Sequence, residues 1–170
     1  MKLLPALFAL FLSLGAHSGE LDDVFSKGVF GTIWGQSSKE VAAQFPSGKK
    51  ETLYGSTRIN VEDGRAVLGI SRSSDSELIF VFDTNNRLSS AGVYFDGKND
   101  FAKLMQKLDS LFGERSPAAG VQGASVIQWR DDQTKLSLTY TSGMFSSETI
   151  LTIEHLGLQK NTKSKEELGF

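Results

Sequence analysis

The sequence predicts an α+β domain in which antiparallel β meanders carry two helices packed on one face, in the order helix, strands, helix, strands. Two segments, 38–45 and 99–112, repeat apolar residues at helical spacing. The segment after each of them changes to strand-like alternation, broken by short turns rich in Asp, Asn and Gly. Strands joined by such short turns pair antiparallel. We therefore expect a single α+β domain over residues 19–156.

Residues 1–18 have the pattern of a secretory signal peptide. Lys2 supplies a positive charge, residues 3–14 are apolar except for one serine, and small residues follow. The alternative, a membrane anchor, needs roughly 20 apolar residues, and this run is shorter. The chain has no cysteine, so the run offers no site for an N-terminal lipid. We predict cleavage before Gly19, with the exact bond left open, and a bacterial protein that is periplasmic or extracellular.

The first half opens with polar residues that we expect to form a short helical turn or an arm over 19–27. Ser37 and Glu40 have the spacing of a capping box, in which each side chain bonds the other residue's backbone amide. This spacing predicts a helix over 38–45, which Pro46 ends.

Four strand-like segments follow that helix. Residues 50–61 predict one or two strands. Asp63-Gly64 predicts a tight hairpin turn, because both residues tolerate positive φ, with a further strand over 66–70. Residues 78–82 and 88–95 are dense apolar strands around a polar turn.

The second half repeats the order of the first. The helix over 99–112 has the longest apolar stripe, so we expect Leu104 and Leu108 to be fully buried. A connection rich in small residues over 116–124 then leads to strands over 125–130, 135–141 and 148–155. Residue identity between the halves is poor, so the sequence leaves a true duplication open. Residues 157–170 are charged and poor in apolar residues, which predicts a C-terminal tail.

The composition argues against most catalytic chemistry. The chain of 170 residues has no cysteine and a formal net charge of −2, which excludes thiolate sites and disfavours a nucleic-acid binder. His155 is the one histidine beyond the signal segment, so neither a Ser-His-Asp relay nor a multi-histidine metal site is expected. The adjacent pairs Asp22-Asp23 and Asp131-Asp132 fit turn or surface roles. We predict no cofactor, no metal and no enzyme activity, with a carboxylate-only enzyme as the remaining alternative.

Aromatic residues on the predicted strands suggest a binding surface instead. Most must be core residues, but Tyr94 and Tyr140 alternate away from the expected core neighbours. An exposed aromatic sheet face would be a partner-binding surface. Met144 and Phe145 stand in a predicted turn, where apolar residues are unusual, so they either return to the core or form a protruding contact loop. These four residues are the predicted partner contacts.

One run of residues resembles a known family. Gly35-Gln36-Ser37-Ser38-Lys39-Glu40-Val41, followed by Phe45-Pro46, resembles the helix opening of small bacterial envelope modules. These modules have the β-lactamase-inhibitor-protein fold or belong to the small outer-membrane assembly lipoproteins. The resemblance implies a binding module built from helices and an antiparallel sheet. The assembly lipoproteins carry a lipidated cysteine that this chain lacks, and no functional residue is carried over.

Two functions follow from these observations. The first is a secreted, non-catalytic binding module that acts on an envelope protein as an inhibitor, immunity factor or assembly accessory. The second is a carrier or sensor of a small apolar ligand such as a lipid, held in a cleft between helix 99–112 and the strands. The sequence gives no oligomeric state.

Overall fold

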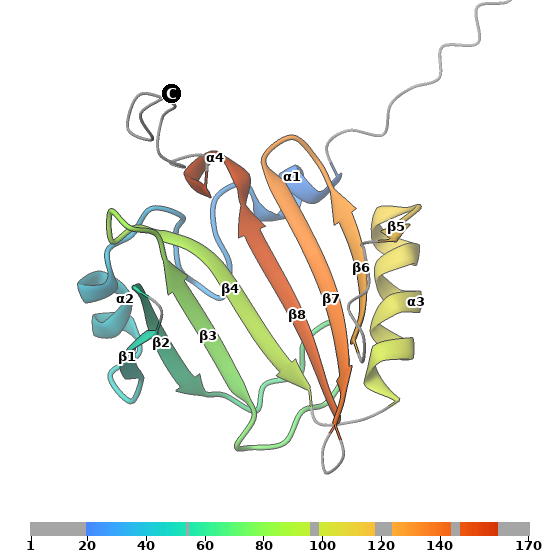
Figure 1. The fold of residues 1–170 in the computed structure, drawn as a ribbon, viewed down its shortest axis with the longest axis horizontal. Helices are drawn as coiled ribbons and strands as arrows, with labels where there is room; N and C mark the ends of the chain where they lie inside the picture. Colours follow the sequence, from blue (N-terminus) through green and yellow to red (C-terminus); the bar gives the residue numbers. More distant parts are fainter. Residues whose placement is uncertain (1–19, 54, 96–98, 118–123, 144–146, 160–170) are drawn as a thin grey trace, which may run out of the picture.

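One eight-stranded antiparallel sheet forms the centre of the computed structural model, which describes residues 20–53, 55–95, 99–117, 124–143 and 147–159. The strands are β1 (Lys49–Leu53), β2 (Ser56–Glu62), β3 (Glu77–Phe82), β4 (Leu88–Phe95), β5 (Ser116–Pro117), β6 (Ala124–Arg130), β7 (Thr134–Ser142) and β8 (Ser147–His155). They lie in the order β1-β2-β3-β4-β8-β7-β6-β5 (Figure 1). Each half of the chain supplies four consecutive strands, and the last strands of the two halves, β4 and β8, pair at the centre.

Helices stand at both ends of this sheet. They are α1 (Glu20–Phe25), α2 (Ser38–Gln44), α3 (Asp100–Phe112) and α4 (Leu156–Gln159). In Figure 1, α2 lies at the end of the sheet formed by β1 and β2, and α3 lies at the opposite end, beside β6. The predicted α+β class and the order helix, strands, helix, strands are confirmed. Of the two alternatives for residues 19–27, the structure has the helical one, the short helix α1, and α4 follows β8 directly.

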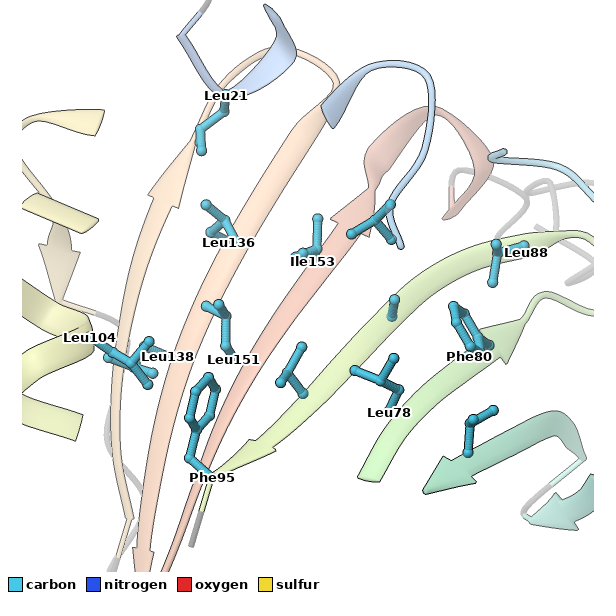
Figure 2. Close-up of a cluster of buried hydrophobic side chains, with 14 of the residues drawn as sticks. Leu21, Leu78, Phe80, Leu88, Phe95, Leu104, Leu136, Leu138, Leu151 and Ile153 are labelled. Atoms are coloured by element: carbon cyan, nitrogen blue, oxygen red, sulfur yellow. The ribbon is translucent and has the colours of Figure 1, made fainter. Parts of the chain in front are cut away.

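The core lies on one face of the sheet. Alternate strand residues meet there, and Figure 2 shows such residues standing on the same side of β3, β4, β7 and β8. Leu21 of α1, Val41 of α2, and Leu104 and Leu108 of α3 belong to the same cluster. Three helices therefore pack on this face, which we call the core face.

Local sequence signals fix the ends of the two principal helices. Ser37 and Glu40 form the predicted capping box, with the Ser37 amide donating to the Glu40 carboxylate at 2.7 Å. On α3, Leu104 and Leu108 are 0% and 1% exposed, as the apolar stripe predicts. Gly113 follows α3 with a φ of 73°, a conformation that glycine adopts without strain.

The predicted hairpin at Asp63-Gly64 is wrong. β2 pairs directly with β3, and residues 63–76 form an irregular connection instead of a strand. The tight turn lies further on, at Leu68-Gly69, where both residues have positive φ and Val67 bridges Ile70. Val67 and Ile70 pack against the core cluster, so the connection covers part of the core face.

The second half differs from the prediction in two places. Ser116–Pro117 form a short strand, β5, that pairs with β6, where a plain connection was expected. The predicted tail starts inside α4, and Leu156 is buried, with its amide donating to the carbonyl of Gln133 at 2.7 Å. Residues 1–18 and most of the predicted tail lie outside the described residues.

Candidate functional site

The candidate site lies on the face of the sheet opposite the core, which we call the open face. The buried apolar residues of α1, α2 and α3 belong to the core cluster, so these helices leave the open face uncovered. Side chains alternate along a strand, and Tyr94 therefore points to the open face because Val93 and Phe95 lie in the core cluster. The pairing between strands then assigns alternate residues of each neighbouring strand to the open face as well.

The register arranges the open face in rows that run across the strands. The charged row is Glu51, Arg58, Val81, Ser90, Glu154, Lys135 and Arg130. The central row is Lys49, Asn60, Ile79, Gly92, Thr152, Ser137 and Gln128. In the tyrosine row, Glu62 faces Glu77, and Tyr94 faces Ile150, which continues to Thr139 and Val126. Glu77 on β3 lies beside Tyr94 on β4. The antiparallel register pairs Leu78 with Val93, so the next residues outward on the two strands are Glu77 and Tyr94.

A hollow of about 220 Å³ interrupts the central row at Gly92. Its lining residues come from β2, β3, β4 and β8: Arg58, Ile79, Val81, Ser90, Gly92, Tyr94, Ile150 and Thr152. A Cβ atom built on Gly92 would meet Ile150 Cγ2 and Ile79 Cβ at 3.9 Å, which is ordinary van der Waals contact. The backbone φ of Gly92 is not positive either. Neither the backbone nor the packing therefore requires glycine here, and its missing side chain leaves the hollow open.

The apolar lining is specific to one half of the sheet. β3 borders β4 as β7 borders β8, so the two strands hold equivalent places in the two halves. On the open face β3 presents Ile79 and Val81, whereas β7 presents Ser137 and Thr139. On this face β3 thus supplies apolar side chains at places where β7 supplies polar ones.

Carboxylates surround the tyrosine at one side of the hollow. Tyr94 is half-buried, and its pKa is raised first by burial and then by the charges of Glu148 and Glu77, while Arg58 acts in the opposite direction. Glu77 and Glu148 have no ion-pair partner among the described residues. We call these two carboxylates the acidic rim.

Arg58 borders the hollow from the opposite side. Within the described ranges this guanidinium makes no ion pair, and its Nε atom is buried without a hydrogen-bond partner. The hollow thus has an apolar floor, carboxylates beside Tyr94 and, from the charged row, a cation without an ion pair among the described residues whose charge also reaches Tyr94.

The four predicted partner contacts do not come together. Tyr94 lies on the open face, but Tyr140 lies on the core face, where its ring is 5.7 Å from that of Phe101 on α3. The expectation that Tyr140 points away from the core is wrong, because it stands two residues after buried Leu138 on β7. Met144 and Phe145 are outside the described residues.

Sequence reasoning missed the other residues of the hollow. Arg58 and Ile150 stand next to buried residues in their strands, so alternation places them on the face opposite the core. Ile79 lies between buried Leu78 and Phe80 and is itself buried, so its strand shows no alternation from which its face could be predicted. Gly92 gave no signal as a site residue, because a glycine within a strand is more often read as a weak point or a bulge.

Of the polar residues considered for catalysis, Asp131 has a structural role. The carboxylate of Asp131 accepts hydrogen bonds from the amides of Leu21 and Asp22 at 2.8 and 3.2 Å, which anchors the start of α1. His155 lies beside Trp34, with ring centroids 6.0 Å apart. In the part of the chain that the structure describes, no three His, Asp or Glu side chains gather as a metal site. None of the helices described there is long and apolar enough to cross a membrane.

Comparisons with protein-family models, with curated proteins and with solved structures give no match.

Proposed function

We propose that the chain is a secreted, non-catalytic binding module whose open face contacts a protein of the bacterial envelope. In this role it serves as an inhibitor, an immunity factor or an assembly accessory. The observation that carries the proposal is the hollow over Gly92, which lies on the central strand pair and is bordered by Tyr94 and Arg58. Tyrosine and arginine are among the residues that contribute most to binding at protein interfaces, and such residues cluster near the interface centre.

The dimensions of the hollow favour a protein partner over a small molecule. Ligand pockets usually enclose about 300–1,000 Å³ and bury most of the ligand, and this hollow of about 220 Å³ is smaller. It lies within a broad sheet face, where threonine and valine side chains offer further contact area. A partner that covers this face would seat one side chain in the hollow and gain the rest of its contacts around it.

A carrier of a small apolar ligand is supported less well. Its expected seat, between α3 and the sheet, is filled by Leu104 and Leu108, which are packed in the core cluster. A larger hollow of about 440 Å³ lies where the C-terminal end of α3 approaches α1 and the end of β6, and its lining mixes apolar side chains with charged ones: Leu21, Phe112, Trp129, Glu20, Glu114, Arg130 and Asp131. Four charged groups in such a lining disfavour the burial of lipid tails.

A pull-down from envelope extract tests the proposed function. The mature protein is compared with Tyr94→Arg, which alters the open face, and with Val24→Arg on α1, where the side chain is 59% exposed. We expect a protein that is retained by the wild type and by Val24→Arg and is lost with Tyr94→Arg, and that binds again after purification. Circular dichroism checks that both variants fold. Equal retention by all three proteins, or no retained protein under several conditions, would refute the proposal.

A further inference from the structure

We propose that the hollow over Gly92 is a socket for one aliphatic side chain of the protein partner, and that the acidic rim takes a lysine or arginine two residues away in the partner's segment. This inference rests on the proposed function and adds to it the chemistry of the partner.

The first support is that neither the backbone nor the packing at Gly92 requires the hollow to be open. Glycine weakens a strand, because it gains nothing from packing and loses more backbone freedom on folding than other residues do. At Gly92 the surroundings accept a Cβ atom without a close contact, yet no side chain is present. A vacancy of this kind in the middle of a sheet is suited to receive a side chain from outside.

The second support is the chemistry of the lining. Ile79 and Val81 border Gly92 from β3, and Ile150 borders it from β8, so the hollow has aliphatic side chains on both flanks. The polar groups stand at its edges, with the hydroxyl of Ser90 at one end of the β4 segment and Tyr94 at the other. A leucine, isoleucine or valine of the partner would bury apolar surface there and leave no polar group of its own unpaired.

The third support is the placement of charge around the hollow. Glu77 is next to Tyr94 in the tyrosine row, and both carboxylates of the acidic rim are close enough to raise the pKa of Tyr94. Arg58 belongs to the charged row, on the other side of the central row, and its charge also reaches Tyr94, where the two carboxylates have the larger effect. A basic residue of a docked segment is therefore directed to the acidic rim.

The spacing of the partner's two side chains follows from strand geometry. Gly92 and Tyr94 are two residues apart on β4, which corresponds to about 7 Å along an extended strand. An extended partner segment lying along β4 places side chains i and i+2 on its same face with the same spacing. An aliphatic residue in the hollow thus brings the residue two positions away, i+2 or i−2 according to the direction of the segment, to the tyrosine row, where the ring of Tyr94 and the acidic rim favour a cation.

Nuclear magnetic resonance titration with short peptides tests this inference directly. The probes are acetyl-Leu-Ser-Lys-amide, acetyl-Leu-Ser-Glu-amide and acetyl-Gly-Ser-Lys-amide, added to the ¹⁵N-labelled mature protein. We expect saturable shifts of the Ile79, Gly92 and Ile150 amides with the first peptide. Replacing either its leucine or its lysine should weaken binding, by about threefold for the charge alone. Equal binding of all three peptides would overturn the chemistry that we assign to the partner.

Two variants separate the socket from general effects on the sheet. Gly92→Val fills the hollow and should weaken binding of the leucine peptide at least about tenfold while the protein stays folded. Thr139→Val is the matched control, because it places the same side chain on the open face outside the hollow. If Gly92→Val does not fold, the double variant Glu77→Gln and Glu148→Gln replaces it and should remove the preference for lysine over glutamate. Unchanged binding by the folded variant would overturn the inference.

The partner found by pull-down distinguishes this inference from the proposed function. A partner that is lost with Tyr94→Arg but bound normally by Gly92→Val would leave the open face as the interface and refute the socket. A partner that binds both variants normally would refute both.

Discussion

Replacing Leu108 by alanine removes a side chain that holds α3 against the sheet. Leu108 is 1% exposed and belongs to the core cluster, so the truncation loses its burial and leaves a cavity. Comparable leucine truncations cost about 2–5 kcal/mol, out of a typical total stability of about 5–15 kcal/mol. For a domain of this size each kcal/mol lowers the melting temperature by about 2–4 °C, which predicts a fall of roughly 4–20 °C.

The control for this experiment is a substitution on the outer face of the same helix. Lys103→Ala and Lys107→Ala should each change the stability by less than about 0.5 kcal/mol. Lys107 is the cleaner choice, because the Lys103 ammonium pairs with Asp100 at 3.1 Å. Thermal unfolding followed by circular dichroism measures all three variants. Equal shifts for Leu108→Ala and Lys107→Ala would show that the buried face of α3 is assigned wrongly.

Three further predictions concern the starts of helices α1 and α2. Asp131→Ala should cost about 1 kcal/mol and reduce hydrogen-exchange protection of the Leu21 amide, because it removes the acceptor at the start of α1, whereas Asp132→Ala should have neither effect. Ser37→Ala should cost about 1 kcal/mol in urea unfolding, because it breaks the capping box of α2. Hydrogen bonds from the side chain and then the backbone of Ser37 lower the pKa of Glu40 below its ordinary value of 4.5. The stabilisation from Glu40 is therefore complete above the unfolded-state pKa and is lost as the pH falls through the lower folded-state pKa, so Glu40→Gln should make stability less dependent on pH there.

The elements that local signals specify could be predicted from the sequence. The stripe of α3 repeats over more than three turns, and the capping box of α2 needs only residues within one turn. The alternation in β4 correctly predicts that Val93 and Phe95 lie on one face of the sheet and Tyr94 on the other. One apolar face is enough to determine which residues of a strand point to the core.

The elements that distant contacts determine could not be predicted. Arg72 donates hydrogen bonds to the carbonyls of Tyr94 and Glu77 at 2.8 and 2.7 Å, and this tertiary anchor holds the irregular connection where a hairpin was expected. The Asp63 carboxylate bonds the Arg65 amide and guanidinium, so it stabilises a local turn that does not reverse the chain into a strand. Residue preferences alone do not contain either contact.

The candidate site depends even more on pairing between strands. Tyr94 could be identified as an exposed aromatic from its own strand, but its neighbours Arg58, Ile79 and Ile150 come from three other strands. Their proximity follows from the order β2-β3-β4-β8, which places the last strands of the two halves side by side. Where a strand alternates, its sequence indicates which residues share a face. The order in which the strands pair cannot be predicted in this way.

Site-specific photo-crosslinking in cells tests most directly whether the open face is the binding surface. A photoreactive amino acid at Tyr94 is compared with the same group at Val24, Ile33 and Leu111, which are 59%, 59% and 42% exposed and lie outside the sheet. Our account predicts a covalent adduct with one envelope protein from position 94 and none from the other three positions. An adduct that forms from positions 24, 33 or 111 and not from position 94 would contradict it.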